Sequence, residues 1–314
     1  MPASVAFLAV IVIWSTTPLA IKWSGDGPGF IFGAAARMCI GALLCWLLVV
    51  AQRLPLPWHG QARRAYLAAA VGIYGAMLSV YWAAQQIPSG WISVIFGLTP
   101  VITGLMASVW LAERALGPLK FLGMGCGLAG LMVIFGRSHS LGVHAALGVG
   151  AVALATVLHS ASSVWVKRIN VDLPALSLTC GALIVSVPLY AITWLVAGQG
   201  WPAELSLRAG LSIVYLAALG SVVGFVAYFY VLKRWEAGRV ALLTLITPVS
   251  ALWLGNVFAD EPLGPQVWAG TGLIMIGLVF HQWDVGMHSA LRSLLRRPAG
   301  WSGRGNAPDE GDGR

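Results

Sequence analysis

One arginine lies inside a long apolar stretch of this 314-residue chain, where an ionised side chain is costly and therefore a candidate for function. Arg37 lies about eight residues into the stretch 29–50, roughly 10 Å from its start at 1.5 Å per helical residue. Its guanidinium could capture a substrate carboxylate or phosphate through two parallel hydrogen bonds. The alternative is a structural tie to helix-end carbonyls or to an acid such as Asp260 or Glu261.

A single histidine, His159, lies near the middle of another apolar stretch, residues 145–166. Its imidazole could relay protons or form a hydrogen bond with a substrate. It could equally bond a carbonyl or hydroxyl across a helix interface, because Ser160, Ser162 and Ser163 follow it closely. A serine hydrolase is disfavoured because no Gly-x-Ser-x-Gly motif surrounds these residues.

Acidic residues are missing from the cores of the apolar stretches, and Glu113, Asp260 and Glu261 come at their ends. This argues against a proton antiporter that needs an embedded carboxylate, and it excludes an intramembrane aspartyl protease, which needs two. The chain also has no phosphate loop, metal-ligand cluster or dinucleotide fingerprint. We therefore predict no catalytic residue, no metal site and no cofactor, and expect that the protein is not an enzyme.

Aromatic residues provide the stronger sign of a binding cavity. Aromatic walls with a few hydroxyls suit neutral or weakly polar substrates and can hold cations by cation–π attraction. Many other tryptophans lie near the ends of apolar stretches and are typical of an interfacial belt. The predicted substrate-binding set is Trp14, Thr17, Arg37, Tyr74, Tyr81, Trp82, His159, Ser163 and Tyr228.

Two prolines, Pro100 and Pro248, interrupt apolar stretches, and each follows a threonine. A proline removes one backbone donor and frees a carbonyl, which the preceding hydroxyl could satisfy. We predict a hinge at each, with a fixed bend that shapes the bundle as the alternative.

These residues must be positioned by membrane-spanning helices. Hydrophobic residues make up 58% of the chain and charged residues 10%, against about 25% charged in soluble domains. A hydrocarbon core of about 30 Å needs roughly 20 apolar residues per helix. The chain offers ten such intervals, and we predict an all-α integral membrane protein with ten transmembrane helices. They are 4–21, 29–50, 65–85, 91–111, 119–135, 145–166, 176–197, 211–232, 240–258 and 265–281.

The basic residues indicate the orientation. With a cytoplasmic N-terminus, fifteen lysines and arginines fall in inner loops and the inner tail, and only Lys22, Arg137 and Arg208 fall in outer loops. The positive-inside rule thus predicts that both termini are cytoplasmic. The net charge of +8 is scattered in short clusters, so it does not indicate nucleic-acid binding.

An internal repeat relates the two halves, since residues 72–113 match residues 220–261 at a constant offset of 148. The matched pairs include Gly72 with Gly220, Thr99-Pro100-Val101 with Thr247-Pro248-Val249, and Glu113 with Glu261. Each half holds five spans, and an odd number inverts the second copy. We predict two inverted five-helix repeats, residues 1–138 and 139–284, followed by a basic and then disordered cytoplasmic tail, residues 285–314.

The pattern resembles the drug/metabolite transporter superfamily, and within it the ten-span EamA family, over residues 5–281. The matching features are Trp14-Ser15 followed by Lys22, Arg37, the two Thr-Pro-Val tripeptides, and the Glu-x-x-x-Gly-Pro and Glu-x-x-Gly-Pro segments. The resemblance implies an inner-membrane carrier, often an exporter, for amino acids, other small metabolites or drugs. It also implies a central cavity lined mainly by spans 1, 3, 4, 6, 8 and 9.

Inverted repeats are a device of secondary transporters. We therefore expect a multi-pass inner-membrane exporter that moves a small organic solute by alternating access. Its expected partners are that solute and the lipid bilayer, and it is expected to be a monomer or a weak homodimer. An uncoupled facilitator or channel, and a membrane-embedded lipid enzyme, remain the alternatives.

Overall fold

The computed structural model describes residues 2–111, 118–135, 142–198, 200–240, 243–261, 263–277 and 279–280. All regular elements in these ranges are helices, which confirms the all-α class. The first half contains α1 (Ala3–Gly25), α2 (Phe30–Ala51), α3 (Gly60–Ala70), η1 (Val71–Ala76), α4 (Met77–Ala83), α5 (Ser89–Phe96), α6 (Thr99–Trp110) and α7 (Pro118–Phe135). The second contains α8 (Val143–Ile169), α9 (Ala175–Val196), α10 (Leu207–Tyr215), η2 (Leu216–Gly224), α11 (Phe225–Arg234), α12 (Ala237–Val240), α13 (Leu243–Ala259) and helical residues 265–277.

Seven of the ten predicted spans are long and apolar enough to cross a membrane in the described residues. They are α1, α2, α8, α9 and three composite helices, Gly60–Ala83, Ser89–Trp110 and Leu207–Arg234. The protein is thus a multi-pass membrane protein. The other three intervals contain α7, α13 and residues 265–277, and their crossing of the membrane stays a prediction. The helices of the third and eighth spans begin before the predicted intervals, at Gly60 and Leu207, because those intervals were drawn on apolar residues and started after the basic residues of the first turns.

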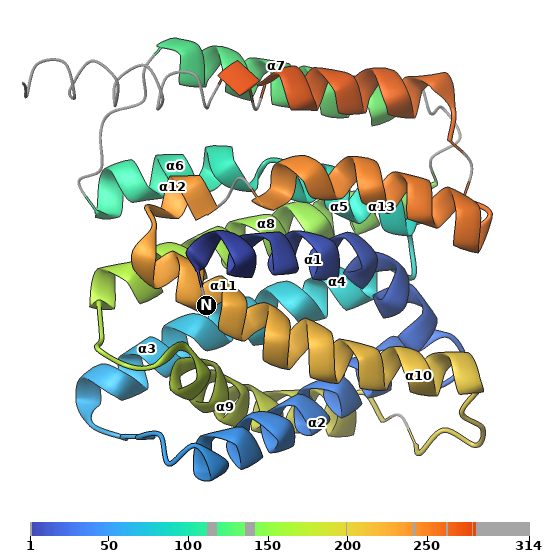
Figure 1. Ribbon diagram of the computed structural model, residues 1–314. Coiled ribbons are helices and arrows are strands. Elements are labelled where there is room, and N and C mark those ends of the chain that lie inside the picture. The colour runs from blue at the N-terminus through green and yellow to red at the C-terminus, as the bar shows by residue number, and fades with distance from the viewer. Residues whose placement is uncertain are drawn as a thin grey trace, which may run out of the picture.

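The helices run side by side in one bundle (Figure 1). Helices α2 and α9 pack together at one edge, and α7 lies at the opposite edge. Between them, α1 packs against α2, α5, α10, α11 and α13, while α8 packs against α3, η1, α4, α5 and α6. These two helices therefore contribute to the interior of the bundle, where a cavity would be enclosed.

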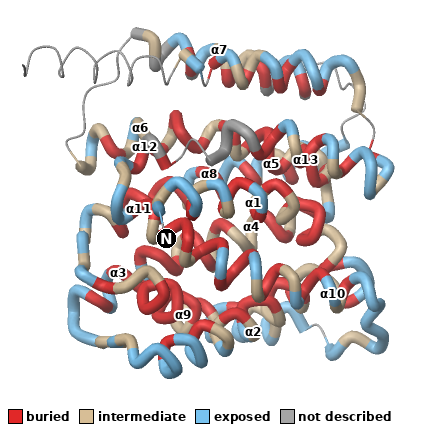
Figure 2. Tube along the Cα trace, viewed as in Figure 1, coloured by how far each residue is buried: buried red, intermediate tan, exposed pale blue. Residues whose placement is uncertain are grey.

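Burial follows the pattern of a protein with lipid as its exterior solvent. Buried residues concentrate in the middle of the bundle, and exposed residues follow the outer sides of α2 and α7 (Figure 2). Large apolar side chains are exposed on several helices, among them Val12, Leu195 and Val196. Such apolar exposure on many faces is what a bilayer requires of the helices that it surrounds.

Two close helix contacts attach α7 to the helical residues 265–277. A Cβ atom on Gly130 would lie 2.5 Å from the Gly270 carbonyl oxygen, and one on Gly277 would lie 2.5 Å from the Gly123 carbonyl oxygen. Both distances are far shorter than a real Cβ contact, so only glycine permits this approach. These glycines therefore pack within one chain.

Two π-helical segments, which no sequence pattern predicted, interrupt the third and eighth spans. Residues Val71–Ala76 form η1 and Leu216–Gly224 form η2. The repeat offset of 148 carries residues 71–76 onto 219–224, so the two segments overlap at matched positions. Such π-bulges are frequent at functional sites because they rotate the side chains that follow them.

The two predicted hinge prolines differ in their local structure. Pro100 lies in the first turn of α6, after turn residues Gly97 and Leu98 that separate α5 from α6. The Thr99 hydroxyl donates to the Phe96 carbonyl at 2.5 Å, which is the carbonyl that Pro100 leaves without its helical donor. Pro248 instead lies inside the continuous helix α13. That either proline acts as a hinge stays a prediction, as does the division into domains, and residues 285–314 lie outside the described ranges.

Candidate functional site

A cavity of about 70 Å³ lies inside the bundle and is lined by residues of seven predicted spans. One buried water molecule needs roughly 10–15 Å³, so the cavity has room for about five waters. The lining residues are Trp14, Thr17, Pro18, Ile21, Arg37, Met77, Val80, Ile92, Ser93, Phe96, His159, Phe225 and Thr247.

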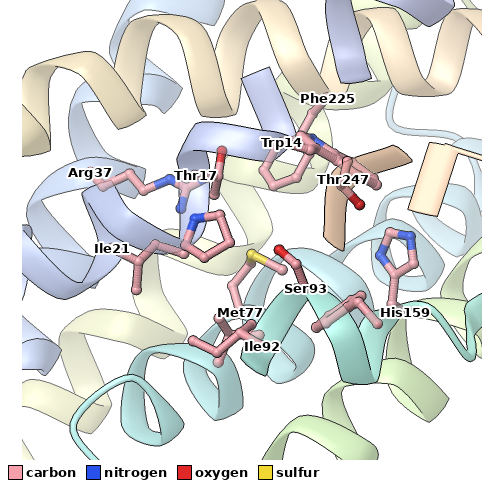
Figure 3. A pocket seen from close by; sticks show the side chains of 13 residues that line it. Trp14, Thr17, Ile21, Arg37, Met77, Ile92, Ser93, His159, Phe225 and Thr247 are labelled. Atoms are coloured by element: carbon pink, nitrogen blue, oxygen red, sulfur yellow. The ribbon is translucent and has the colours of Figure 1, made fainter. Parts of the chain in front are cut away.

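Arg37 is the charged group of this lining, and its side chain is 1% exposed. Its Nε donates to the Ser221 hydroxyl of η2 at 2.9 Å, and that hydroxyl lies 3.8 Å from Met38 Sδ. Neither Nη1 nor Nη2 forms a hydrogen bond with a described residue, and Nη1 is fully buried. Figure 3 shows the guanidinium pointing toward Thr17 on α1.

Aromatic rings and a glycine hold this guanidinium in place. Its central carbon lies 5.9 Å from the ring centroids of both Tyr81 and Phe225, at the outer limit of cation–π contact. A Cβ atom on Gly220 would lie 3.1 Å from Nη2, so the absent side chain leaves room for the guanidinium. The alternative tie of Arg37 to Asp260 or Glu261 is not seen.

His159 lies on the other side of the cavity from Arg37 (Figure 3) and is 7% exposed. Its ring centroid lies 5.5 Å from that of Trp14, 5.2 Å from that of Tyr228 and 6.0 Å from that of Phe96. Its ring nitrogens form no hydrogen bond within the described part of the chain. The alternative, a bond from the imidazole to a carbonyl or hydroxyl, is not seen, and Ser163 Oγ instead donates to the His159 backbone carbonyl at 2.7 Å.

Ser163 and Tyr228 do not line the cavity but lie next to the aromatic residues that do. Their hydroxyls form a hydrogen bond with each other, and both side chains are buried. The Tyr228 ring lies 5.1 Å from the Trp14 ring and 5.2 Å from the His159 ring, so it packs against both. That Ser163 and Tyr228 contribute to substrate binding stays a prediction.

The remaining predicted residues divide between the cavity and other surroundings. Thr17 lines the cavity, and its hydroxyl donates to the Ile13 carbonyl at 2.7 Å. Tyr81 lies beside the Arg37 guanidinium, and its own hydroxyl is buried without a partner in the described residues. Tyr74 is directed toward α9, where its hydroxyl lies 2.7 Å from Thr193 Oγ1. Trp82 is half-buried and is not part of the lining.

Several lining residues were not predicted from the sequence. Ser93 and Thr247 carried a usable signal, since each is a hydroxyl inside an apolar stretch and Thr247 belongs to the repeated Thr-Pro-Val. Ile21, Met77 and other aliphatic lining residues carried none, because cavity walls and packed cores use the same side chains.

A carboxylate joins the end of α1 to the start of α5 beside the cavity. Lys22 Nζ donates to Glu261 Oε1 at 2.8 Å. The same carboxylate accepts the Ser89 amide at 2.8 Å, the Ser89 hydroxyl at 3.0 Å and the Gly90 amide at 3.2 Å. Lys22 follows the lining residue Ile21. We call this group of Lys22, Glu261, Ser89 and Gly90 the carboxylate clasp.

The clasp holds Glu261 ionised. Burial alone would raise the pKa of this carboxyl, which is 5% exposed, but the donated hydrogen bonds from Lys22, Ser89 and Gly90 outweigh burial and lower the pKa. The two amides are unpaired donors of the first turn of α5, where a helix favours negative charge. The Glu261 carboxylate therefore accepts hydrogen bonds from amides that the helix leaves unpaired, and it also pairs with the charge of Lys22.

The chemistry of the site is that of recognition. The lining provides one cation, three hydroxyls (Thr17, Ser93 and Thr247), one imidazole and several aromatic faces. It contains no acidic residue. In the described residues no group of three or more His, Cys, Asp or Glu side chains could hold a metal ion.

Comparisons with known proteins agree with this architecture. A family model described as the EamA-like transporter family matches residues 1–136 and 146–281. An inner membrane transporter of Escherichia coli strain K12, YedA, is 25% identical over 89% of this chain and 90% of its own. A protein named a probable terminal-alkyne amino-acid exporter, from Streptantibioticus cattleyicolor, is 25% identical over 80% of this chain and 85% of its own. A crystal structure superposes with a TM-score of 0.67 at 21% identity over 89% of this chain and 96% of that chain, which shows the shared fold.

Proposed function

The chain belongs to the EamA-like transporter family, and we propose that it is a secondary transporter that exports a small organic metabolite by alternating access. The metabolite would be an amino acid, another small metabolite or a drug-like compound, crossing the inner membrane. The amino-acid exporter among the relatives supports this class of cargo and this direction. The names of the family and of the relatives indicate transporters and not enzymes.

The observation that carries the proposal is the cavity inside the bundle and the origin of its lining. Helices α1, α2, α4 and α5 of the first half provide most of the wall, and His159, Phe225 and Thr247 come from the second half. A site between two halves is what alternating access requires, because a relative movement of the halves then changes which end is open.

The proposal includes ten spans arranged as two inverted repeats. The 148-residue offset supports this, together with the two π-helical segments that fall at overlapping matched positions. The glycine contacts between α7 and residues 265–277 also join the last spans of the two halves as equivalent partners.

We further propose that both termini are cytoplasmic, as the distribution of lysines and arginines predicts. This orientation assigns the carboxylate clasp to the outer side of the membrane. The clasp would then close the outer end of the cavity in this conformation, with Lys22 at the end of α1 and Ser89 at the start of α5.

Reconstituted vesicles test the function. Purified protein in proteoliposomes is assayed for uptake of radiolabelled amino acids, organic acids, nucleobases and organic cations, with and without a pH gradient. We expect saturable flux of at least one class and accelerated exchange when the same compound is present on the other side. Steady flux without saturation or counter-flow would indicate an uncoupled channel, and no flux of any class would contradict transport.

A cavity-filling variant tests whether the flux passes through this cavity. Ser93→Phe adds a ring to a residue that lines the cavity, and Leu105→Phe adds one to a side chain that is 41% exposed on the lipid side of α6. We expect Ser93→Phe to abolish the flux and Leu105→Phe to retain it. Equal loss in both would contradict transport through this cavity.

A further inference from the structure

We propose that the cargo of this site is a monocarboxylate with an apolar body, held by Arg37 at its carboxylate and by the aromatic residues near His159 at its other end. This assignment rests on the proposed transport function and specifies its substrate class. It starts from an unusual feature, a buried guanidinium that has no acidic partner in the described residues.

The state of the guanidinium indicates an anionic ligand. The Ser221 hydroxyl binds Nε alone, and neither Nη1, which is fully buried, nor Nη2 forms a hydrogen bond with a described residue. A buried charge is retained only where it is paired or where it pairs during function. The two Nη groups provide parallel donors at the spacing of the two oxygens of one carboxylate.

The charge of the lining indicates a monoanion. Arg37 is the one cation among the lining residues, and Lys22 nearby is already paired with Glu261. One carboxylate would neutralise this charge. A dianionic phosphate would leave a net negative charge in a lining that has no second cation to balance it.

The absence of an acid from the lining indicates that the site does not require an ammonium group. An amino acid brings a cation as well as a carboxylate, and the lining provides no carboxylate to pair with it. Only aromatic faces and three hydroxyls could contact the ammonium, and they would bind it more weakly than a carboxylate would. The site therefore accepts an amino group without depending on it.

The rest of the wall matches an apolar body. Ile21, Met77, Val80 and Ile92 also line the cavity, and the rings of Trp14 and Phe96 pack against His159. Arg37 and His159 lie at opposite sides of the cavity in Figure 3. A cargo that reaches both is elongated, with its carboxylate at one end.

Five matched probes test the carboxylate requirement on the unaltered protein. The thermal shift of the purified full chain is titrated with 3-phenylpropionate, 3-phenylpropionamide and L-phenylalanine, and with 3-methylbutyrate and its amide as a smaller pair. We expect saturable shifts with the acids and at least tenfold weaker binding of the matching amides. L-Phenylalanine should bind no more tightly than 3-phenylpropionate. Equal binding of acid and amide, tighter binding of the amino acid, or no shift with any acid would overturn the proposal.

Substitution of the arginine tests the residue. We expect Arg37→Lys to weaken binding of 3-phenylpropionate at least tenfold, because a lysine cannot donate two parallel hydrogen bonds. Arg208→Lys, at an exposed position outside the cavity, is the matched control and should bind normally. If Arg37→Lys binds the acid as the unaltered protein does, the assignment of Arg37 is wrong. If this variant does not fold, the acid and amide comparison decides the matter alone.

Failure of this assignment is distinguishable from failure of the proposed function. Saturable flux of amides, bases or cations in the vesicles, without preference for acids, would overturn the carboxylate assignment and leave transport standing. Absence of saturable flux for every class would overturn transport itself, whatever the detergent titrations show.

Discussion

Lys22 Nζ lies 2.8 Å from Glu261 Oε1, although 239 residues separate the two in the chain. The lysine lies in the last turn of α1 and the glutamate follows α13, so their contact connects α1 to the segment after α13. The same carboxylate binds the first amides of α5. One acidic side chain thus joins three of the cavity-lining spans at one end.

Removal of the charge on Glu261 should open that end. Glu261→Gln loses the ion pair and places an amide group against the donors of α5, at a cost of about 1–3 kcal/mol. A cysteine at the lining position Ser93, in a cysteine-free background, should then react faster with a membrane-impermeant maleimide added from the clasp side, by about tenfold per 1.4 kcal/mol.

Asp260→Asn provides the control for this substitution. Asp260 is an exposed neighbour at φ 51°, a backbone conformation that asparagine tolerates as well as aspartate does. Its labelling rate should equal that of the parent. An unchanged rate in Glu261→Gln would show that the clasp does not close the cavity.

Acidification should weaken the clasp in the unaltered protein. The pKa of Glu261 is lower in the folded protein than its ordinary value of 4.5. The stabilisation is therefore complete above that ordinary value and is lost as the pH falls through the lowered pKa of the folded state. The melting temperature in detergent should fall below about pH 5, and the fall should be smaller in Glu261→Gln.

Asp172 provides the control for the pH dependence of the melting temperature. A hydrogen bond from Lys233 lowers its pKa, but its side chain is fully exposed. Asp172→Asn should therefore retain most of the pH dependence of the parent. Loss of the whole dependence in this variant would contradict the role of Glu261.

The matched residue of the first half should act in the opposite sense. The repeat pairs Glu113 with Glu261, and because Glu113 lies outside the described residues its role is predicted from the repeat alone. In inverted halves, Glu113→Gln should raise labelling of Ser93→Cys from the other side of the membrane. The measurement is the ratio of labelling in inside-out and right-side-out vesicles. A change of the same sign in both variants would contradict the inverted arrangement.

Gly220→Ala should disturb the guanidinium without altering any charge. The new Cβ would lie 3.1 Å from Arg37 Nη2, and crowding of this kind costs about 1–3 kcal/mol. Binding of 3-phenylpropionate should weaken accordingly in a thermal-shift titration. Gly210→Ala in the same span makes only ordinary contacts at 3.6 Å and should bind normally. Normal binding in both variants would count against a fixed position of the guanidinium.

Gly277→Ala should weaken the attachment of α7 to residues 265–277. Its Cβ would lie 2.5 Å from the Gly123 carbonyl oxygen, so the helices must separate, at a cost of about 1–3 kcal/mol. The melting temperature of the purified protein should fall. Gly272→Ala on the same helix meets open space and should melt as the parent does. Equal melting temperatures for both variants would show that this contact does not contribute to stability.

The helices of this protein could be predicted because apolar runs of the required length leave few alternatives in a bilayer. The π-helical segments and the separation of α5 from α6 could not, because hydrophobic runs do not report the hydrogen-bond register. Arg37, His159 and Trp14 stood out as polar or aromatic residues in apolar surroundings. The direction of Tyr74 toward α9 could not be predicted, because it depends on which face of its helix turns inward.

The sequence by itself determined the membrane class, the helical fold and the family, because composition and repeat spacing are properties of the chain alone. Tertiary structure decided which cation Glu261 would bind. The sequence suggested Arg37 as an alternative partner, but packing brought Lys22 to the carboxylate and buried Arg37 beside Ser221 in the cavity wall. The reason is geometric, since a charge pairs with the group that the helices bring within reach, and only their packing sets that distance.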